Sequence, residues 1–119
     1  MKKLIALALL QIVSLSAQAN GSLCFITASR YHTYQRSAQI CQNVGSDVCF
    51  QEAFRYTTLL RAAQACEFVY SDTCVIDGLR YNSLAPTVRA CRGLISDICY
   101  TRMRQTHGIT RAIQVCKGQ

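Results

Sequence analysis

The chain has 119 residues, of which 50% are hydrophobic and 16% are charged, and its formal net charge is +7. This length leaves room for one small domain and excludes a second large one. The apolar content argues against a disordered basic tail, while the positive charge permits anionic partners without identifying one.

The first nineteen residues have the three regions of a secretory signal peptide. A basic start at residues 1–3 is followed by an apolar stretch over residues 4–17 and by the small-X-small sequence AQA at residues 17–19. Because this stretch is shorter than the roughly 20 residues that span a bilayer, we expect cleavage rather than anchoring. Residues 1–19 are predicted to be removed, which takes two lysines away and changes the net charge from +7 to +5. The mature chain, residues 20–119, is predicted to be a single helical-repeat domain without a transmembrane segment, secreted or periplasmic.

Eight cysteines divide the mature chain into a strict repeat. Their separations alternate between 17 and 8 residues, so every second cysteine lies 25 residues after its counterpart. A fixed period of this size indicates a solenoid or an array of small units. The units cover residues 24–48, 49–73, 74–98 and the shorter 99–119. Other residues keep the same period: Arg30-Tyr31, Arg55-Tyr56 and Arg80-Tyr81 inside the units, and Ser46-Asp47, Ser71-Asp72 and Ser96-Asp97 at their boundaries.

Each unit is predicted to contain two short antiparallel helices. The units are rich in Ala, Arg, Gln and Leu, which favour helix, and they lack the alternating β-branched runs of strands. One continuous helix would place cysteines 17 residues apart at a distance of about 25 Å, whereas a disulfide requires Cα atoms within about 7 Å. We therefore predict an all-α fold, a short α-solenoid of four 25-residue disulfide-stapled helical hairpins.

Residues suited to begin the second helix of each hairpin stand at one repeat position. Thr33, Thr58 and Ser83 each offer a side-chain oxygen that can cap a helix start, and Gly108 takes this position in the fourth unit. Pro86 follows Ser83 by three residues, within the first helical turn, where proline is tolerated. These residues predict that the chain reverses direction just before them.

The second unit illustrates the predicted elements. We expect Asp47 to cap a first helix over residues 48–56, and a second helix to cover residues 59–69. The predicted buried stripe of the second helix is Leu59, Ala62, Ala63, Cys66 and Val69, repeated in the third unit as Leu84, Thr87, Val88, Cys91 and Leu94. The first helix is expected to bury Phe50, Ala53 or Phe54, and Tyr56.

The repeat also predicts the disulfides. Bonds within hairpins would join Cys24–Cys41, Cys49–Cys66, Cys74–Cys91 and Cys99–Cys116, which uses all eight cysteines. The alternative joins neighbouring units through Cys41–Cys49, Cys66–Cys74 and Cys91–Cys99, and leaves Cys24 and Cys116 without partners. We favour the first scheme, in which each bond stabilises its hairpin by about 3 kcal/mol through loop closure.

The Arg-Tyr row, formed by Arg30, Arg55, Arg80, Tyr31, Tyr56 and Tyr81, is the candidate binding site. Guanidinium groups bind phosphates and carboxylates, and a tyrosine ring adds a stacking surface. The structural alternative, which we favour, is that these arginines pack between repeats or pair with Asp47, Asp72 or Asp97. The positions that vary between units are weaker candidates for specificity: Tyr34, Gln35, Gln51, Glu52, Phe68, Tyr70 and Arg92.

No motif for catalysis, metal binding or a cofactor is present in the sequence. It contains no phosphate-binding glycine loop, no G-x-S-x-G and no H-E-x-x-H, and the cysteines and histidines lack zinc-site spacing. We therefore expect a protein that is not an enzyme and needs no cofactor or metal. In layout the array is similar to the Sel1-like and tetratricopeptide repeat classes, although their signature residues are absent and its period is shorter.

The sequence favours an exported binding module whose partner is a protein or peptide, with an anionic glycan or lipid as the second partner class and nucleic acid disfavoured. An alternative function is that of a secreted cationic effector acting on membranes or anionic envelope polymers, because the mature chain is rich in arginine. The identity of the partner and the oligomeric state are left open by the sequence.

Overall fold

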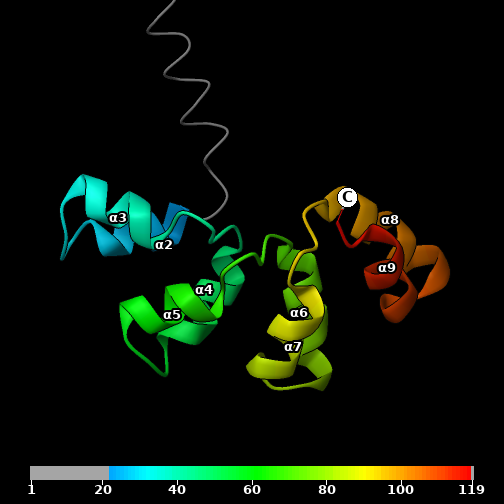
Figure 1. The fold of residues 1–119 in the computed structure, drawn as a ribbon. Helices are drawn as coiled ribbons and strands as arrows, with labels where there is room; N and C mark the ends of the chain where they lie inside the picture. Colours follow the sequence, from blue (N-terminus) through cyan, green and yellow to red (C-terminus); the bar gives the residue numbers. More distant parts are fainter. Residues whose placement is uncertain (1–21, 119) are drawn as a thin grey trace, which may run out of the picture.

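The computed structural model describes residues 22–118, which form four helical hairpins placed one after another in chain order (Figure 1). The predicted signal peptide, residues 1–19, lies outside this range. The helices are α2 (Ser22–Ala28) and α3 (Tyr34–Ile40), α4 (Asp47–Phe54) and α5 (Leu59–Ala65), α6 (Asp72–Tyr81) and α7 (Leu84–Cys91), and α8 (Asp97–His107) and α9 (Ile109–Cys116). Within the described residues no strand is present beyond one isolated bridge between Val44 and Val69. The predicted α-solenoid of four hairpins is confirmed.

A disulfide closes the base of every hairpin, opposite its turn. The bonds join Cys24 to Cys41, Cys49 to Cys66, Cys74 to Cys91 and Cys99 to Cys116, with Cα–Cα distances of 5.8 or 5.9 Å. These are the within-hairpin pairs that the repeat favours. Each bond links the first turn of one helix to the end of its partner helix, so the two arms cannot separate at this end.

The first helix of each later hairpin is capped by serine, and the prediction that Asp47 caps it is wrong. The side-chain oxygen of Ser46 accepts from the backbone N–H of Cys49 at 3.1 Å, and Ser71 and Ser96 do the same one and two repeats later. Serine is the N-cap residue because it stands one residue before the aspartate and has an extended backbone. From this position its side-chain oxygen reaches the N–H three residues ahead. The aspartate is already the first residue of the helix.

The displaced aspartates connect neighbouring hairpins instead. Asp72 Oδ1 accepts from the hydroxyl of Ser46 at 2.6 Å and from the N–H of Val48 at 3.3 Å. Asp97 accepts in the same way from the Ser71 hydroxyl and the Thr73 N–H. Each aspartate therefore completes the capping of the first helix in the preceding hairpin. It also places a negative charge at the positive N-terminal end of that helix.

A second set of bonds between hairpins runs along the backbone at the hairpin bases. The N–H of Phe68 donates to Asn43 O, that of Gly93 donates to Phe68 O, and that of Gly118 donates to Gly93 O, at 2.8, 2.8 and 3.1 Å. One such bond crosses each junction. Phe68, Gly93 and Gly118 adopt φ values of 63°, 84° and 83°, a region that glycine reaches without strain and phenylalanine does not.

Both helices of the second hairpin are shorter than predicted. The second helix of the second hairpin ends at Ala65 and not at residue 69, because the chain enters the left-handed turn at Phe68 to meet the preceding hairpin. The first helix ends at Phe54, before the turn that contains Tyr56. Phe50 and Ala53 of this helix are buried, as predicted, whereas Tyr56 is 78% exposed, so its predicted burial is wrong.

The second helices begin where predicted. Thr33 and Thr58 accept from the N–H groups of Arg36 and Arg61, three residues later. Ser83 occupies the same cap position but makes no side-chain cap bond. The reason is Pro86, which stands three residues after Ser83 and has no N–H to donate.

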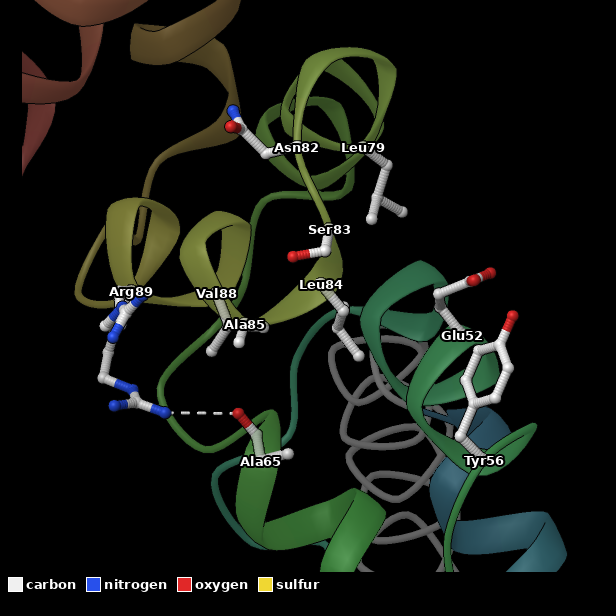
Figure 2. A pocket seen from close by; sticks show the side chains of 11 residues that line it. Glu52, Tyr56, Ala65, Leu79, Asn82, Ser83, Leu84, Ala85, Val88 and Arg89 are labelled. Atoms are coloured by element: carbon white, nitrogen blue, oxygen red, sulfur yellow. Dashed lines mark hydrogen bonds between the residues drawn. The ribbon is translucent and has the colours of Figure 1, made fainter.

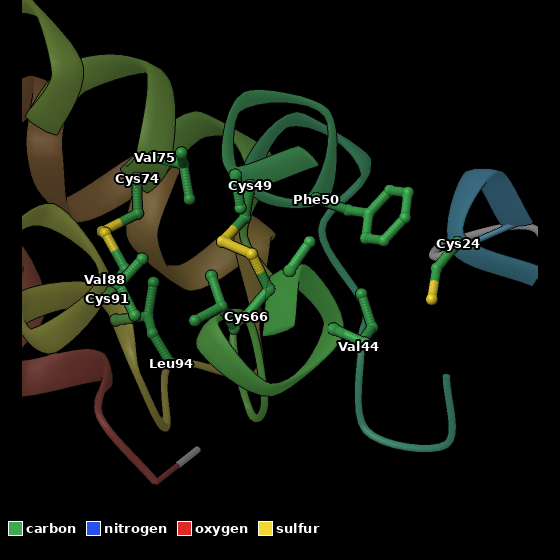
Figure 3. Packing of buried hydrophobic residues seen from close by; sticks show 14 of the residues in the cluster. Cys24, Val44, Cys49, Phe50, Cys66, Cys74, Val75, Val88, Cys91 and Leu94 are labelled. Carbon is green, nitrogen blue, oxygen red and sulfur yellow. A yellow bond between two sulfur atoms is a disulfide. The ribbon is translucent and has the colours of Figure 1, made fainter. Parts of the chain in front are cut away.

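The core is a narrow row of disulfides and small or medium apolar side chains along the inner faces of the hairpins (Figure 3). The predicted stripe is largely correct, since Ala62, Ala63, Cys66 and Val69 are buried, and Leu59 is partly buried. In the third hairpin Thr87, Val88, Cys91 and Leu94 are buried as well. Phe50, Val75 and Tyr100, all at one repeat position, are fully buried.

Replacing Asp72 by alanine is expected to lower the free energy of unfolding by about 2 kcal/mol, because two charge-assisted hydrogen bonds are lost at the junction. Denaturant unfolding of the oxidised protein, followed by circular dichroism, measures the change. Glu67→Ala serves as the control, because Glu67 is an exposed acidic residue of the second hairpin. It is expected to change the free energy of unfolding by less than about 0.5 kcal/mol. Equal losses in the two variants would contradict the assignment.

Gly93→Ala is expected to cost about 1 kcal/mol through backbone strain alone. A Cβ atom at residue 93 would meet only the Lys117 side chain, at 3.7 Å, so crowding does not contribute. Gly93→Asn should cost less, since asparagine tolerates left-handed φ values. Thermal unfolding of both variants gives the comparison, and an alanine variant as stable as the parent would disprove the strain.

Candidate functional site

The Arg-Tyr row lies at the tips of the first three hairpins, at the ends remote from the disulfides. Tyr31, Tyr56 and Tyr81 are 71%, 78% and 75% exposed, and the three arginines before them are exposed too. The row is therefore accessible to a partner in three successive hairpins.

The expectation that these arginines pair with Asp47, Asp72 or Asp97 is wrong, because each of those carboxylates accepts bonds from the preceding hairpin. Arg55 instead forms an ion pair with Glu52 at 3.4 Å within the same hairpin, with 64% of its side chain exposed. In the described part of the chain the guanidinium groups of Arg30 and Arg80 have no partner.

An open groove runs between the second and third hairpins and includes one member of this row (Figure 2). We call it the inter-hairpin groove. Its volume is about 850 Å³, and its surface is mostly apolar. It is lined by Glu52, Tyr56 and Ala65 of the second hairpin, and by Leu79, Asn82, Ser83, Leu84, Ala85, Val88, Arg89 and Arg92 of the third.

The groove carries opposite charges at its two ends. Glu52 and Tyr56 lie at one end, and Arg89 lies at the other, with the side chains of Leu84 and Val88 between them (Figure 2). Arg92 reaches across the junction from the third hairpin and donates to the carbonyl of Ala65 at 3.2 Å. It thereby ties the two walls together and satisfies a carbonyl at the end of α5.

The equivalent junction between the third and fourth hairpins is bridged by a polar cluster around a buried carboxylate. Asp77 is 2% exposed and forms an ion pair with Arg104 Nη1 at 2.7 Å. Its second oxygen accepts from the hydroxyl of Tyr100, also at 2.7 Å. Burial, together with the Asp77 hydrogen bond, raises the pKa of Tyr100 well above its ordinary value.

The repeat relates this cluster to the groove. Glu52 stands 25 residues before Asp77, while Val75 and Leu79 stand 25 residues before Tyr100 and Arg104. A carboxylate thus occupies the same position at both junctions, but only the later junction supplies a hydroxyl and a guanidinium to meet it. At the earlier junction both opposing side chains are apolar: Leu79 lines the open groove, and Val75 is buried.

The weaker sequence candidates divide between structural and groove positions. Tyr34 packs edge-on against Phe25 at 4.9 Å, and Phe68 belongs to the junction backbone. Tyr70 covers Gly45, where an added Cβ would collide with its ring. Only Glu52 and Arg92 of the seven line the groove.

Two further properties concern the described residues as a whole. Across residues 22–118 no group of three or more His, Cys, Asp or Glu side chains is arranged to hold a metal ion. No helix in that range is long and apolar enough to cross a membrane.

Comparison of the chain with protein-family models, with curated proteins and with solved structures gives no match. The features of the molecule that bear on its function are the groove, the Arg-Tyr row and the disulfide-rich helical scaffold that presents them.

Tyr100→Phe is expected to cost about 1 kcal/mol near neutral pH, because the buried Asp77 carboxylate loses a donor. The raised pKa keeps Tyr100 neutral in the fold, whereas the unfolded chain ionises it near pH 10. Its stabilising contribution is therefore complete below about pH 10 and is lost as the pH rises further. Urea unfolding from pH 8 to pH 11 should show the two proteins converging. Tyr81→Phe, at an exposed position, is the control and should follow the parent at every pH.

Proposed function

We propose that this disulfide-rich helical repeat protein is an exported binding module that engages a protein or peptide in the inter-hairpin groove. The observation that carries the proposal is the groove itself: an open, mostly apolar space of about 850 Å³ between two hairpins. Binding sites in proteins are typically concave and apolar with a few polar groups at defined places. Glu52, Asn82 and Arg89 supply such groups around this one.

The scaffold supports a binding role in a second way. The groove walls belong to hairpins that are each closed by a disulfide, and Arg92 connects them. A site built on such fixed elements loses little conformational entropy when a partner binds. Export is supported by the predicted signal peptide and by four disulfides, which persist in oxidising compartments.

Selection from a displayed library of random linear twelve-residue peptides tests the proposal. The oxidised protein, residues 20–119, is expected to enrich peptides that bind with micromolar or better affinity. Ala85→Trp places a bulky ring in the groove from an exposed helical position. It should abolish binding of the enriched peptides while leaving the circular dichroism spectrum unchanged.

Tyr31→Ser is the matched control, because it alters an exposed tip tyrosine outside the groove. Peptides that bind the Ala85→Trp variant as well as the parent would contradict the proposal. Asn82→Trp is a second groove substitution at an exposed position. It should also abolish binding of the enriched peptides, which would show that the loss is not peculiar to residue 85.

The alternative function, a cationic effector that acts on membranes or anionic envelope polymers, is favoured by one observation. The Arg-Tyr row presents exposed cations next to exposed aromatic rings in three hairpins. Arginines draw a protein to an anionic surface, and tyrosine suits the boundary between water and lipid.

Charge reversal at Arg30, Arg55 and Arg80 separates the two functions. If the alternative holds, the triple substitution to glutamate should abolish binding to vesicles of phosphatidylglycerol at low salt, while the parent is released by high salt. A parent protein that leaves such vesicles unbound at low salt rules the alternative out. The groove proposal expects peptide binding to survive in a protein that carries the reversals at residues 30 and 80.

A further inference from the structure

We propose that the occupant of the inter-hairpin groove is a peptide segment that places an arginine or lysine side chain against Glu52, with apolar residues following along the groove. This inference rests on the proposed function and specifies its partner. It derives from the way the same fold satisfies the equivalent carboxylate one junction later.

The fold satisfies that later carboxylate with a guanidinium. Asp77 accepts two contacts from Arg104 Nη1, at 2.7 and 2.8 Å, and a third from Tyr100. Both donors come from α8, the first helix of the next hairpin. The repeat position therefore has a geometry in which a carboxylate receives a cation across a junction.

At the groove the same carboxylate position lacks a donor on the facing helix. Val75 and Leu79 replace the tyrosine and the arginine, and neither has a polar group. Leu79 and Glu52 both line the groove, so an incoming side chain that lies over Leu79 meets the Glu52 carboxylate. A bound basic side chain would take the place that Arg104 takes at the next junction.

The one ion pair that Glu52 makes does not replace such a partner. In the described residues its carboxylate pairs only with Arg55, at 3.4 Å and three residues along the chain. That arginine is 64% exposed, and exposed pairs of this kind contribute little. A cation that arrives with apolar surface would shield the Glu52 carboxylate from water and form a stronger contact.

The rest of the groove is complementary to the same kind of segment. Leu84, Ala85 and Val88 offer an apolar floor beside Glu52. At the opposite end the guanidinium of Arg89 has no partner among the described residues. A peptide with a basic residue, apolar residues and then an acidic side chain or terminal carboxylate fits this order of charges.

The peptides selected against the parent protein provide the test. They should carry arginine or lysine next to apolar residues far more often than the unselected library does. Glu52→Gln keeps the size and hydrogen-bonding ability of the side chain but removes its charge. It should weaken binding of a selected peptide at least about tenfold, measured by fluorescence anisotropy. Replacing the basic residue of that peptide by citrulline or norleucine should weaken binding to the parent equally, and should have little effect on Glu52→Gln.

Leu79→Arg gives an independent test, because it recreates within the chain the arrangement of Arg104 and Asp77. The introduced guanidinium should occupy the Glu52 end and reduce peptide binding at least about tenfold, with a melting temperature equal to or above that of the parent. Leu79→Met is the matched control, since it keeps the side chain apolar and close to the same volume and should bind normally. Adding Glu52→Gln to Leu79→Arg removes the intramolecular pair and should lower the melting temperature.

The outcomes separate the inference from the proposed function. If selected peptides lose binding with Ala85→Trp but lack basic residues, or bind Glu52→Gln as well as the parent, the groove binds a different chemistry and the inference is wrong. If no selected peptide is sensitive to Ala85→Trp, the proposed function fails with it. Basic peptides that depend on both Glu52 and the open groove support both.

Discussion

The disulfide at the base of each hairpin is the constraint on which the rest of the structure depends. The eight described helices have only 7 to 11 residues, a length at which isolated helices are marginal in water. Closure of each 17-residue separation holds two such helices together, at a contribution of about 3 kcal/mol for each loop. It also fixes the capping serine and the following turn next to the corresponding parts of the neighbouring hairpin. The Ser-Asp bonds and the backbone bonds at the junctions can then form between prepositioned groups.

This arrangement separates a structural end of each hairpin from a free end. The hydrogen bonds that recur at the junctions lie at the disulfide end, where Asp72, Phe68 and Gly93 connect successive hairpins. Among residues 22–118 the tips carry no such recurring connection, and their tyrosines are exposed. The groove extends from the structural end, where Arg92 holds its walls, to the tip at Tyr56. The walls of the groove are therefore held at the disulfide end, and the groove is left open toward the tips.

Much of this architecture could be predicted because cysteine spacing converts directly into distance. The number of helices and the direction of each hairpin follow from the 25-residue period and the reach of a disulfide. The within-hairpin pairing is the one of two schemes that uses all eight cysteines, and the buried stripe follows from the spacing of apolar residues along a helix. The sequence does not determine which residue caps α4, because Ser46 and Asp47 are both good capping residues and only backbone geometry shows which one stands at the extended position. It does not determine the end of α5 either, because no residue type there marks Phe68 for a left-handed conformation, as glycine marks Gly93 at the same repeat position.

The groove was missed for a different reason, since the alignment of the repeats already contains its signal. Glu52 and Asp77 share one repeat position, and the two residues that face them change from valine and leucine to tyrosine and arginine. Which side chains face each other across a junction is known only once the hairpins are placed side by side. The sequence therefore could not show that this change bridges the later junction with hydrogen bonds and leaves a groove at the earlier one. In a repeat array the backbone supplies the same position many times, and two side chains decide whether that position holds a buried ion pair or is left open. The buried Asp77 cluster and the open groove are these two outcomes within one chain.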